Sequence, residues 1–423
     1  MSRGSLIVIQ ECLVLGTISL TEWSDGPLPL SVTNGEGIET RSGETERLDY
    51  FSHRIASALY PVGRRKWRHF ANGFLEVLAP AENVPDSTYL VVWHRSLGDI
   101  YEASIAADEV LNTIETMQSL VAPAMALNAE SLKVIRSFYM VSGVIDEFAL
   151  GVLPSQYNDV WTIPEQYAWR LATLINSEFG DTPPLDEISN LRRNGARVNL
   201  TNDLLIMVEH DGCSLVGVAD ADESPDPFES WLAGESAHDD SQLTFVELEW
   251  HTIFLDCFLL GILQRSGLNR IADQFAGLTD HQPKISEMLK LERSFAEFKA
   301  AIWWHQVTEE RAANQVLRAF QREHSLDDLL AELGRDLSHY SDQIQTLSVA
   351  RSSAALTVLS LTLLPITVIL YIIQSVVPAN SGDFLRIGAY LLSVPIALVL
   401  AFGLAALIPG YLELLRDVVR RSE

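Results

Sequence analysis

Polar side chains recur at a regular spacing inside a long apolar segment near the C-terminus. Seven positions follow one another at alternating steps of four and three residues: Ser353, Thr357, Ser360, Leu364, Thr367, Tyr371 and Gln374. This spacing places them on one face of a helix. A polar stripe on one face of a membrane helix requires contact with water or with another helix, and we interpret it as pore-lining.

The segment that carries this stripe has no charged residue. Residues 352–382 lack Asp, Glu, Lys and Arg, and so do residues 387–412. Each stretch exceeds the roughly 20 residues that cross a hydrocarbon core of about 30 Å, so we expect spans at about 353–377 and 387–409. The second span has no matching stripe, so it should surround the first. Packing between helices is the alternative role for the stripe, because Ser and Thr also bond to their own backbone.

Basic residues lie on one side of this expected transmembrane hairpin, within 352–412. Its outer flanks carry Arg351, Arg416, Arg420 and Arg421, whereas the connection between the spans carries Arg386 alone. Because Lys and Arg in short flanks stay in the cytoplasm, both termini should be cytoplasmic. The sequence therefore predicts a multi-pass protein of the inner (cell) membrane with a short cytoplasmic tail at 413–423.

The chain before the hairpin is long and acidic. Of 423 residues, 30 are Lys or Arg and 56 are Asp or Glu, which gives a net charge of −26. Such a surface repels nucleic acid and attracts cations. Runs rich in Val and Leu at 73–78 and 89–93, and an Asp211-Gly212 turn between two apolar runs, predict strands. We therefore expect an acidic α/β cytoplasmic domain over residues 1–244.

Long helices should follow over residues 245–351. The pattern predicts helices at 245–275 and 284–322, and then a heptad repeat. Its apolar positions are Leu326, Leu330, Leu333, Leu337, Tyr340, Ile344 and Leu347. A repeat of this kind predicts a stalk that is buried against other helices, of this chain or of identical subunits. The stalk should run without a break into the first span.

Two charged clusters are candidate binding sites. The acidic cluster consists of Asp220, Asp222, Glu223 and Asp226, which could hold a divalent cation or form a solvated acidic loop. The basic cluster consists of Arg64, Arg65, Lys66 and Arg68. It could bind a small anionic ligand, or it could balance the acidic surface around it.

No motif of an enzyme accompanies these clusters. The sequence contains no phosphate-binding loop, dinucleotide fingerprint, nucleophile elbow or HExxH zinc motif. We therefore expect no enzymatic activity and no bound cofactor, and a divalent cation only as substrate or regulator.

The predicted architecture resembles the CorA-type metal-ion transporters over nearly the whole chain. The shared features are an acidic α/β domain, long helices, a stalk continuous with the first span, a short loop and a second span. The resemblance implies a homopentamer with the first span lining the pore and Gly-Met-Asn at its outer end. Here that place reads Pro378-Ala379-Asn380, so Asn380 should form the outer ring, with Asp383 as the acidic loop residue. Because Gly and Met are missing, strict magnesium selectivity is not expected.

Two functions follow from the sequence. The first is a CorA-like oligomeric channel or transporter for cations, weakly selective for divalent metals such as Mg²⁺ or Zn²⁺. The alternative is a ligand-gated CorA-like membrane effector. It would bind a nucleotide-type messenger at the basic cluster and permeabilise or depolarise the membrane, as in antiviral defence.

Overall fold

The computed structural model describes most of the chain up to Val376. The described residues are 3–146, 161–174, 196–219, 245–279 and 285–376, without the gaps 17, 19, 21, 34–38, 43–46, 48–49, 61–62, 81–86, 100–102 and 202–203, together with residue 188 and a few isolated positions after 387. The chain divides into two compact units. The sheet unit comprises Met1–Gly277 and Arg293–Leu333, and the other unit comprises Leu278–Glu292 and Gly334–Glu423.

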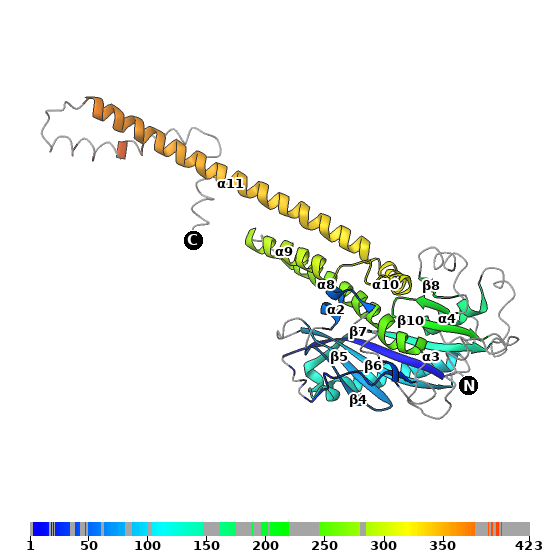
Figure 1. Ribbon diagram of the computed structural model, residues 1–423. Coiled ribbons are helices and arrows are strands. Elements are labelled where there is room, and N and C mark those ends of the chain that lie inside the picture. Colours follow the sequence, from blue (N-terminus) through cyan, green and yellow to red (C-terminus); the bar gives the residue numbers. More distant parts are fainter. Residues whose placement is uncertain are drawn as a thin grey trace. The chain divides into compact units, whose positions relative to one another are not determined.

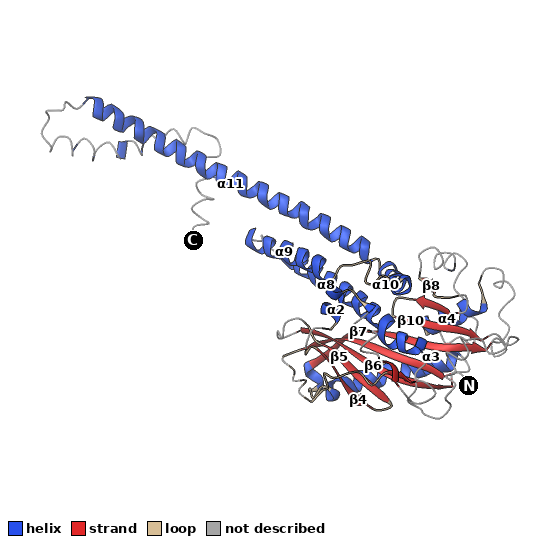
Figure 2. Cartoon of the chain, viewed as in Figure 1, coloured by secondary structure: helices blue, strands red, loops and turns tan. Residues whose placement is uncertain are grey.

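The sheet unit is built on eight described strands in the order β4-β5-β6-β1-β7-β10-β9-β8 (Figure 2). Their bounds are β1 Arg3–Val14, β4 Arg65–Phe70, β5 Gly73–Leu78, β6 Ser87–Asp99, β7 Leu132–Asp146, β8 Arg197–Asn199, β9 Leu204–Val208 and β10 Gly212–Ala219. A second, small sheet pairs β2 Ser31–Thr33 with β3 Glu39–Ser42. Neighbours in the large sheet are antiparallel, except that β7 and β10 run parallel. The strands expected at 73–78 and 89–93 and the Asp211-Gly212 hairpin are confirmed.

Figure 1 labels most of the described helices up to residue 323. Their bounds are α2 His53–Leu59, α3 Ala103–Ala124, α4 Ile163–Thr173, α7 Phe245–Glu249, a π-helix Trp250–Phe254, α8 Leu255–Thr279, α9 Ile285–Ala301 and α10 Arg311–Glu323. Because side chains alternate along each strand, the sheet has two apolar faces. On one face, Val8 of β1 belongs to the core that includes residues of α3 and α4. On the other face, the Phe138 ring meets Phe258 of α8 and Phe320 of α10, with centroids 5.3 and 5.5 Å apart.

The prediction of one continuous helix over residues 284–322 was wrong. The chain forms α9 and α10, which are separated at residues 302–310. The Gln264 side chain donates to the Ile302 carbonyl at 2.9 Å, and the Asn314 carboxamide oxygen accepts from the Val307 amide at 2.7 Å. Side chains therefore satisfy backbone groups that a continuous helix would have paired internally, and the helical periodicity did not reveal them.

The helix α11 spans Leu326–Val376 and contains 51 residues. It begins where the heptad repeat begins, and Leu326, Leu333 and Leu337 are only 1%, 5% and 2% exposed. Among the residues that the structure describes, no helix combines the length and the hydropathy that a membrane crossing requires. The second expected span, at 387–409, lies outside the described residues apart from isolated positions.

Candidate functional site

All seven positions of the expected pore-lining stripe lie on α11. The structure describes the side chains of four of them, and all four are exposed in the single chain: Ser353, Ser360, Thr367 and Tyr371. Leu356 and Ile372, which lie off the stripe, are exposed as well. The helix therefore brings the stripe onto one continuous element, but exposure within one chain does not separate the polar face from the apolar one.

The candidate cation ligands lie elsewhere in the chain. Asn380 and Asp383 of the expected outer ring are outside the described residues, and so is the acidic cluster that begins at Asp220. Within the described part of the chain, no group of three or more His, Cys, Asp or Glu side chains could hold a metal ion.

Three members of the basic cluster, Arg65, Lys66 and Arg68, lie on β4 and contact groups inside the protein, and Arg64 directly precedes the strand. Lys66 Nζ lies 3.4 Å from the Leu20 carbonyl oxygen, and Arg68 donates to the Ala124 carbonyl at 2.9 Å. Arg65 binds two buried carboxylates, as described below. The Arg64 carbonyl accepts a hydrogen bond from the Ala79 amide, one residue beyond the paired ends of β4 and β5. The side chains of Arg65, Lys66 and Arg68 therefore tie β4 to neighbouring parts of the protein.

Arg65 belongs to a buried ionic network that the sequence did not predict. Its members are Arg47, Arg65, Glu76, His94, His251 and Asp256. They come from the chain before α2, from β4, β5 and β6, from the π-helix and from α8. The network therefore joins one end of the sheet to the helical layer.

Glu76 accepts hydrogen bonds from three side chains. Arg47 makes a two-pronged contact at 2.8 and 3.1 Å, and Arg65 makes another with both distances at 3.2 Å. His94 Nε2 lies 3.0 Å from the same carboxylate. Although burial acts in the opposite direction, the two arginines and His94 hold the pKa of Glu76 well below its ordinary value. Glu76 is therefore ionised.

Asp256 is the second buried carboxylate of the network. Its oxygens lie 2.8 Å from Arg65 Nη2 and 3.3 Å from Arg47 Nε. Burial raises the pKa of Asp256 to about 7, and Arg47 opposes this shift. With two arginines and two carboxylates the network is balanced in charge, which is the condition for keeping such groups out of water. Asp256 is the carboxylate closest to protonation near neutral pH.

The two histidines have fixed roles in the hydrogen bonding. His94 Nε2 donates to Glu76, so the Nδ1 of neutral His94 accepts from His251 Nδ1, which lies 2.9 Å away. Burial lowers the pKa of both rings, because neither cation can be hydrated there. Protonation of His251 alone would leave its Nδ1 contact intact. Protonation of His94 would put two N–H groups face to face.

The backbone around His251 is adapted to this contact. His251 belongs to the π-helix, and its carbonyl accepts from Arg47 Nη2 at 3.2 Å. Single π turns inside helices often mark functional sites. Only Glu76 indicated the buried network in the sequence. It interrupts the apolar strand Gly73–Leu78, and a charge at such a position requires a buried partner.

The chain has no match among protein-family models and none among curated proteins.

Proposed function

We propose that the chain is a subunit of an oligomeric cation channel or transporter of the CorA type, placed in a cell membrane and weakly selective among divalent metals such as Mg²⁺ and Zn²⁺. The observation that carries the proposal is the continuity of α11. This helix passes without a break from the buried leucines 326, 333 and 337 into the uncharged sequence that begins at residue 352. A single helix can transmit a rotation along its hydrogen-bonded length, so the stalk and the polar stripe form one mechanical element.

Several copies of the stripe are needed to enclose water. In the proposed assembly the same face of α11 from each subunit lines a central axis, and Ser360, Thr367 and Tyr371 contribute polar groups to it. Leu364 forms the constriction, because a ring of leucines between polar rings can close a pore by dewetting. The second uncharged segment surrounds α11 and separates it from lipid.

Cation recognition is assigned to Asn380 at the outer end of the pore. Its amide oxygen can accept hydrogen bonds from the water around an ion without removing that water, which suits Mg²⁺ because Mg²⁺ loses its water reluctantly. Pro378 lacks a backbone donor, so the proposed ring should be looser than one built on Gly-Met-Asn. Weak discrimination among cations follows.

The ligand-gated effector is the second proposal. Its messenger site was assigned to the basic cluster, where Arg65, Lys66 and Arg68 contact protein groups. These contacts favour a structural role for the cluster and thus support the channel over the effector.

Flux through the full chain in liposomes tests the proposal. We expect Mg²⁺, Zn²⁺, Na⁺ and K⁺ all to pass, and Asn380→Ala to change their order of preference. Asn269→Ala, at an exposed position of α8, is the matched control and should leave the order unchanged. An unaltered order in Asn380→Ala would refute the role of Asn380. Flux that appears only after a cytoplasmic ligand is added would favour the effector.

A further inference from the structure

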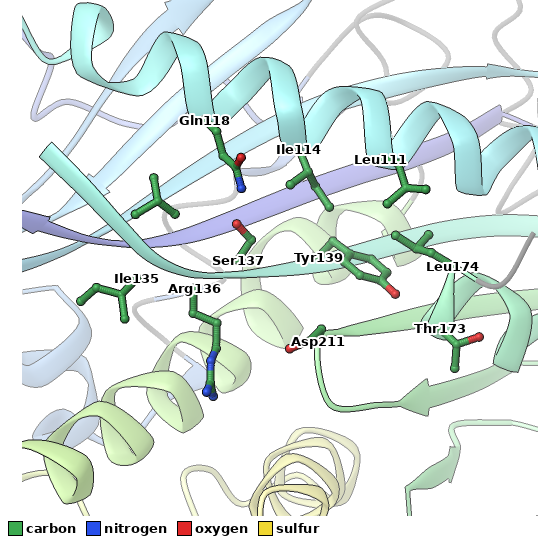
Figure 3. A pocket seen from close by; sticks show the side chains of 11 residues that line it. Leu111, Ile114, Gln118, Ile135, Arg136, Ser137, Tyr139, Thr173, Leu174 and Asp211 are labelled. Atoms are coloured by element: carbon green, nitrogen blue, oxygen red, sulfur yellow. The ribbon is translucent and has the colours of Figure 1, made fainter. Parts of the chain in front are cut away.

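A cavity of about 650 Å³ opens beside β7, between α3 and the end of α4 (Figure 3). It exists because of the strand pairing. β1 pairs with β7 from Leu132 onward, whereas β10 pairs with β7 only from Tyr139 onward. Among the described residues, the first half of β7 therefore has a strand on one side only, and the cavity lies on the other. Its volume is in the range of small-molecule sites, about 300–1,000 Å³.

One wall of the cavity is mainly apolar. Leu111, Ile114 and Gln118 point from α3 toward β7, and Leu174 lies across from Leu111 (Figure 3). Leu111 is 44% exposed, and Ile135 at the rim is 51% exposed. These side chains would lose contact with water if an apolar group filled the cavity, and burial of apolar surface stabilises a complex.

The opposite rim carries Arg136. The register of β1 and β7 shifts between Glu11 and Cys12, and this bulge lies beside Ile135 and Arg136. The backbone of Arg136 is paired with β1, but within the described part of the chain its side chain makes no hydrogen bond and no ion pair. A guanidinium in this position is suited to bind a carboxylate or a phosphate with two parallel hydrogen bonds.

The carboxylate opposite Arg136 in the sheet is already occupied. Glu11 pairs with Arg136 in register, but its oxygens accept from Ser266 and lie 3.9 Å from Arg265 Nη2. Burial and then repulsion from Arg136 lower the pKa of Arg265 to about 10, whereas Glu11 and Asp211 oppose the shift. Arg136 thus adds to a cationic region, and an anion at the rim would relieve that repulsion. Asp211 also lines the cavity, and its carboxylate would repel a bound anion.

We propose that this cavity binds a small amphipathic organic anion, with its carboxylate or phosphate at Arg136 and its apolar body against Leu111 and Ile114. Gln118 lies on the same wall and can hydrogen-bond to a polar substituent. Every lining residue belongs to the sheet unit, so the proposal does not depend on whether α11 lines a pore.

Calorimetric titration of the full chain with three probes tests the proposal: 2-naphthoate, 2-naphthyl phosphate and the neutral 2-naphthamide. The first two differ in their anionic group, so their relative affinities show whether a carboxylate or a phosphate is preferred. We expect saturable binding of at least one anion, with one site per chain, and at least about tenfold weaker binding of the amide, since a charge-assisted contact exceeds 1.4 kcal/mol.

Three variants and one control variant make the test specific. Arg136→Met should weaken the preferred anion at least about tenfold and change the amide by less than about twofold. Asp211→Asn keeps the turn, because Asn-Gly suits it as well as Asp-Gly, and should strengthen the anion by about two- to fivefold. Ile114→Trp should fill the cavity and weaken all three probes. Arg270→Met removes an exposed arginine of α8 and should change nothing.

Each opposite result overturns the proposal. Equal affinity for anion and amide would exclude Arg136 as the anion site. So would an unchanged anion affinity in Arg136→Met, or weaker anion binding in Asp211→Asn with an unchanged melting temperature. Failure of every probe to bind at millimolar concentration would mean that the cavity is not a site for such molecules.

Discussion

Glu76 holds together the charged interior of the sheet unit. Arg47, Arg65 and His94 all donate to it, and it lies on β5, between the other two strands of the network. Removing one partner from such a group leaves an uncompensated buried charge, which typically costs about 3–5 kcal/mol. The network therefore fixes the pairing of strands and helices more than it adds to net stability.

The His251 ring should make the stability of this unit depend on pH. Burial, His94 and Arg47 hold its pKa well below the ordinary value. The unfolded chain binds a proton near pH 6.5 that the folded chain does not, so stability that is present above about pH 6.5 is lost as the pH falls below it. Asp256 acts in the opposite sense: its raised pKa of about 7 means that the folded state takes up a proton first, which favours folding as the pH falls toward about 4.

We expect His251→Asn to lose less stability than the wild type between about pH 7 and 5, by up to about 1.4 kcal/mol per pH unit. The Asn amide can replace the Nδ1–H donor, but it does not titrate. Unfolding midpoints followed by tryptophan fluorescence measure the effect. His69→Asn, at an exposed position of β4, should keep the wild-type pH profile. Identical profiles for His251→Asn and the wild type would contradict the argument.

At the scale of elements, α8 and α10 pack closely because α8 has a glycine at the contact. A Cβ at Gly261 would lie 2.4 Å from Cδ1 of Phe320, which is fully buried. We expect Gly261→Ala to destabilise the sheet unit by about 1–3 kcal/mol, because the ring has no room to move. Denaturant unfolding of the full chain measures the change.

The same helix supplies the control. A Cβ at Gly277 would meet no atom within 4 Å, so Gly277→Ala should stabilise α8 by about 0.5–1 kcal/mol through helix propensity. If both substitutions stabilised the protein, close packing of α8 against Phe320 would not be the reason for Gly261.

The polar stripe of α11 is tested by cysteine substitution. If it lines water, cysteines at Thr357, Ser360, Thr367 and Tyr371 should react with small hydrophilic thiol reagents when the pore is open. Cysteines on the apolar face, at Leu359, Leu363 and Leu370, should react at least several-fold more slowly. The native cysteines are all buried, so their background reaction should be low. Equal rates on both faces would assign the stripe to helix packing instead.

At the scale of the whole molecule, the proposed pore requires a symmetric oligomer. One polar stripe cannot surround water by itself. The resemblance to the CorA-type family implies five subunits, so the assembly of 47.0 kDa chains should have a protein mass of about 235 kDa. Native mass spectrometry from detergent or nanodiscs measures it. A monomer or a dimer would remove the basis of both the pore and the family resemblance.

Local pattern alone predicted several elements of this protein. Short runs rich in Val and Leu located β5 and part of β6, the Asp211-Gly212 pair located the β9–β10 hairpin, and the heptad repeat located the start of α11. These signals succeed because each depends on residues that are close in sequence, where the periods of strand and helix and the geometry of turns are decided.

Other features were decided only by tertiary contacts. The break between α9 and α10 depends on Gln264, which lies 38 residues before the carbonyl to which it donates. The network around Glu76 joins Arg47 to Asp256, and the cavity at Arg136 exists because β10 stops short along β7. No local pattern encodes a partner so distant in sequence. Burial makes such pairings specific, because a charge or backbone group removed from water must find its counterpart wherever the fold brings it.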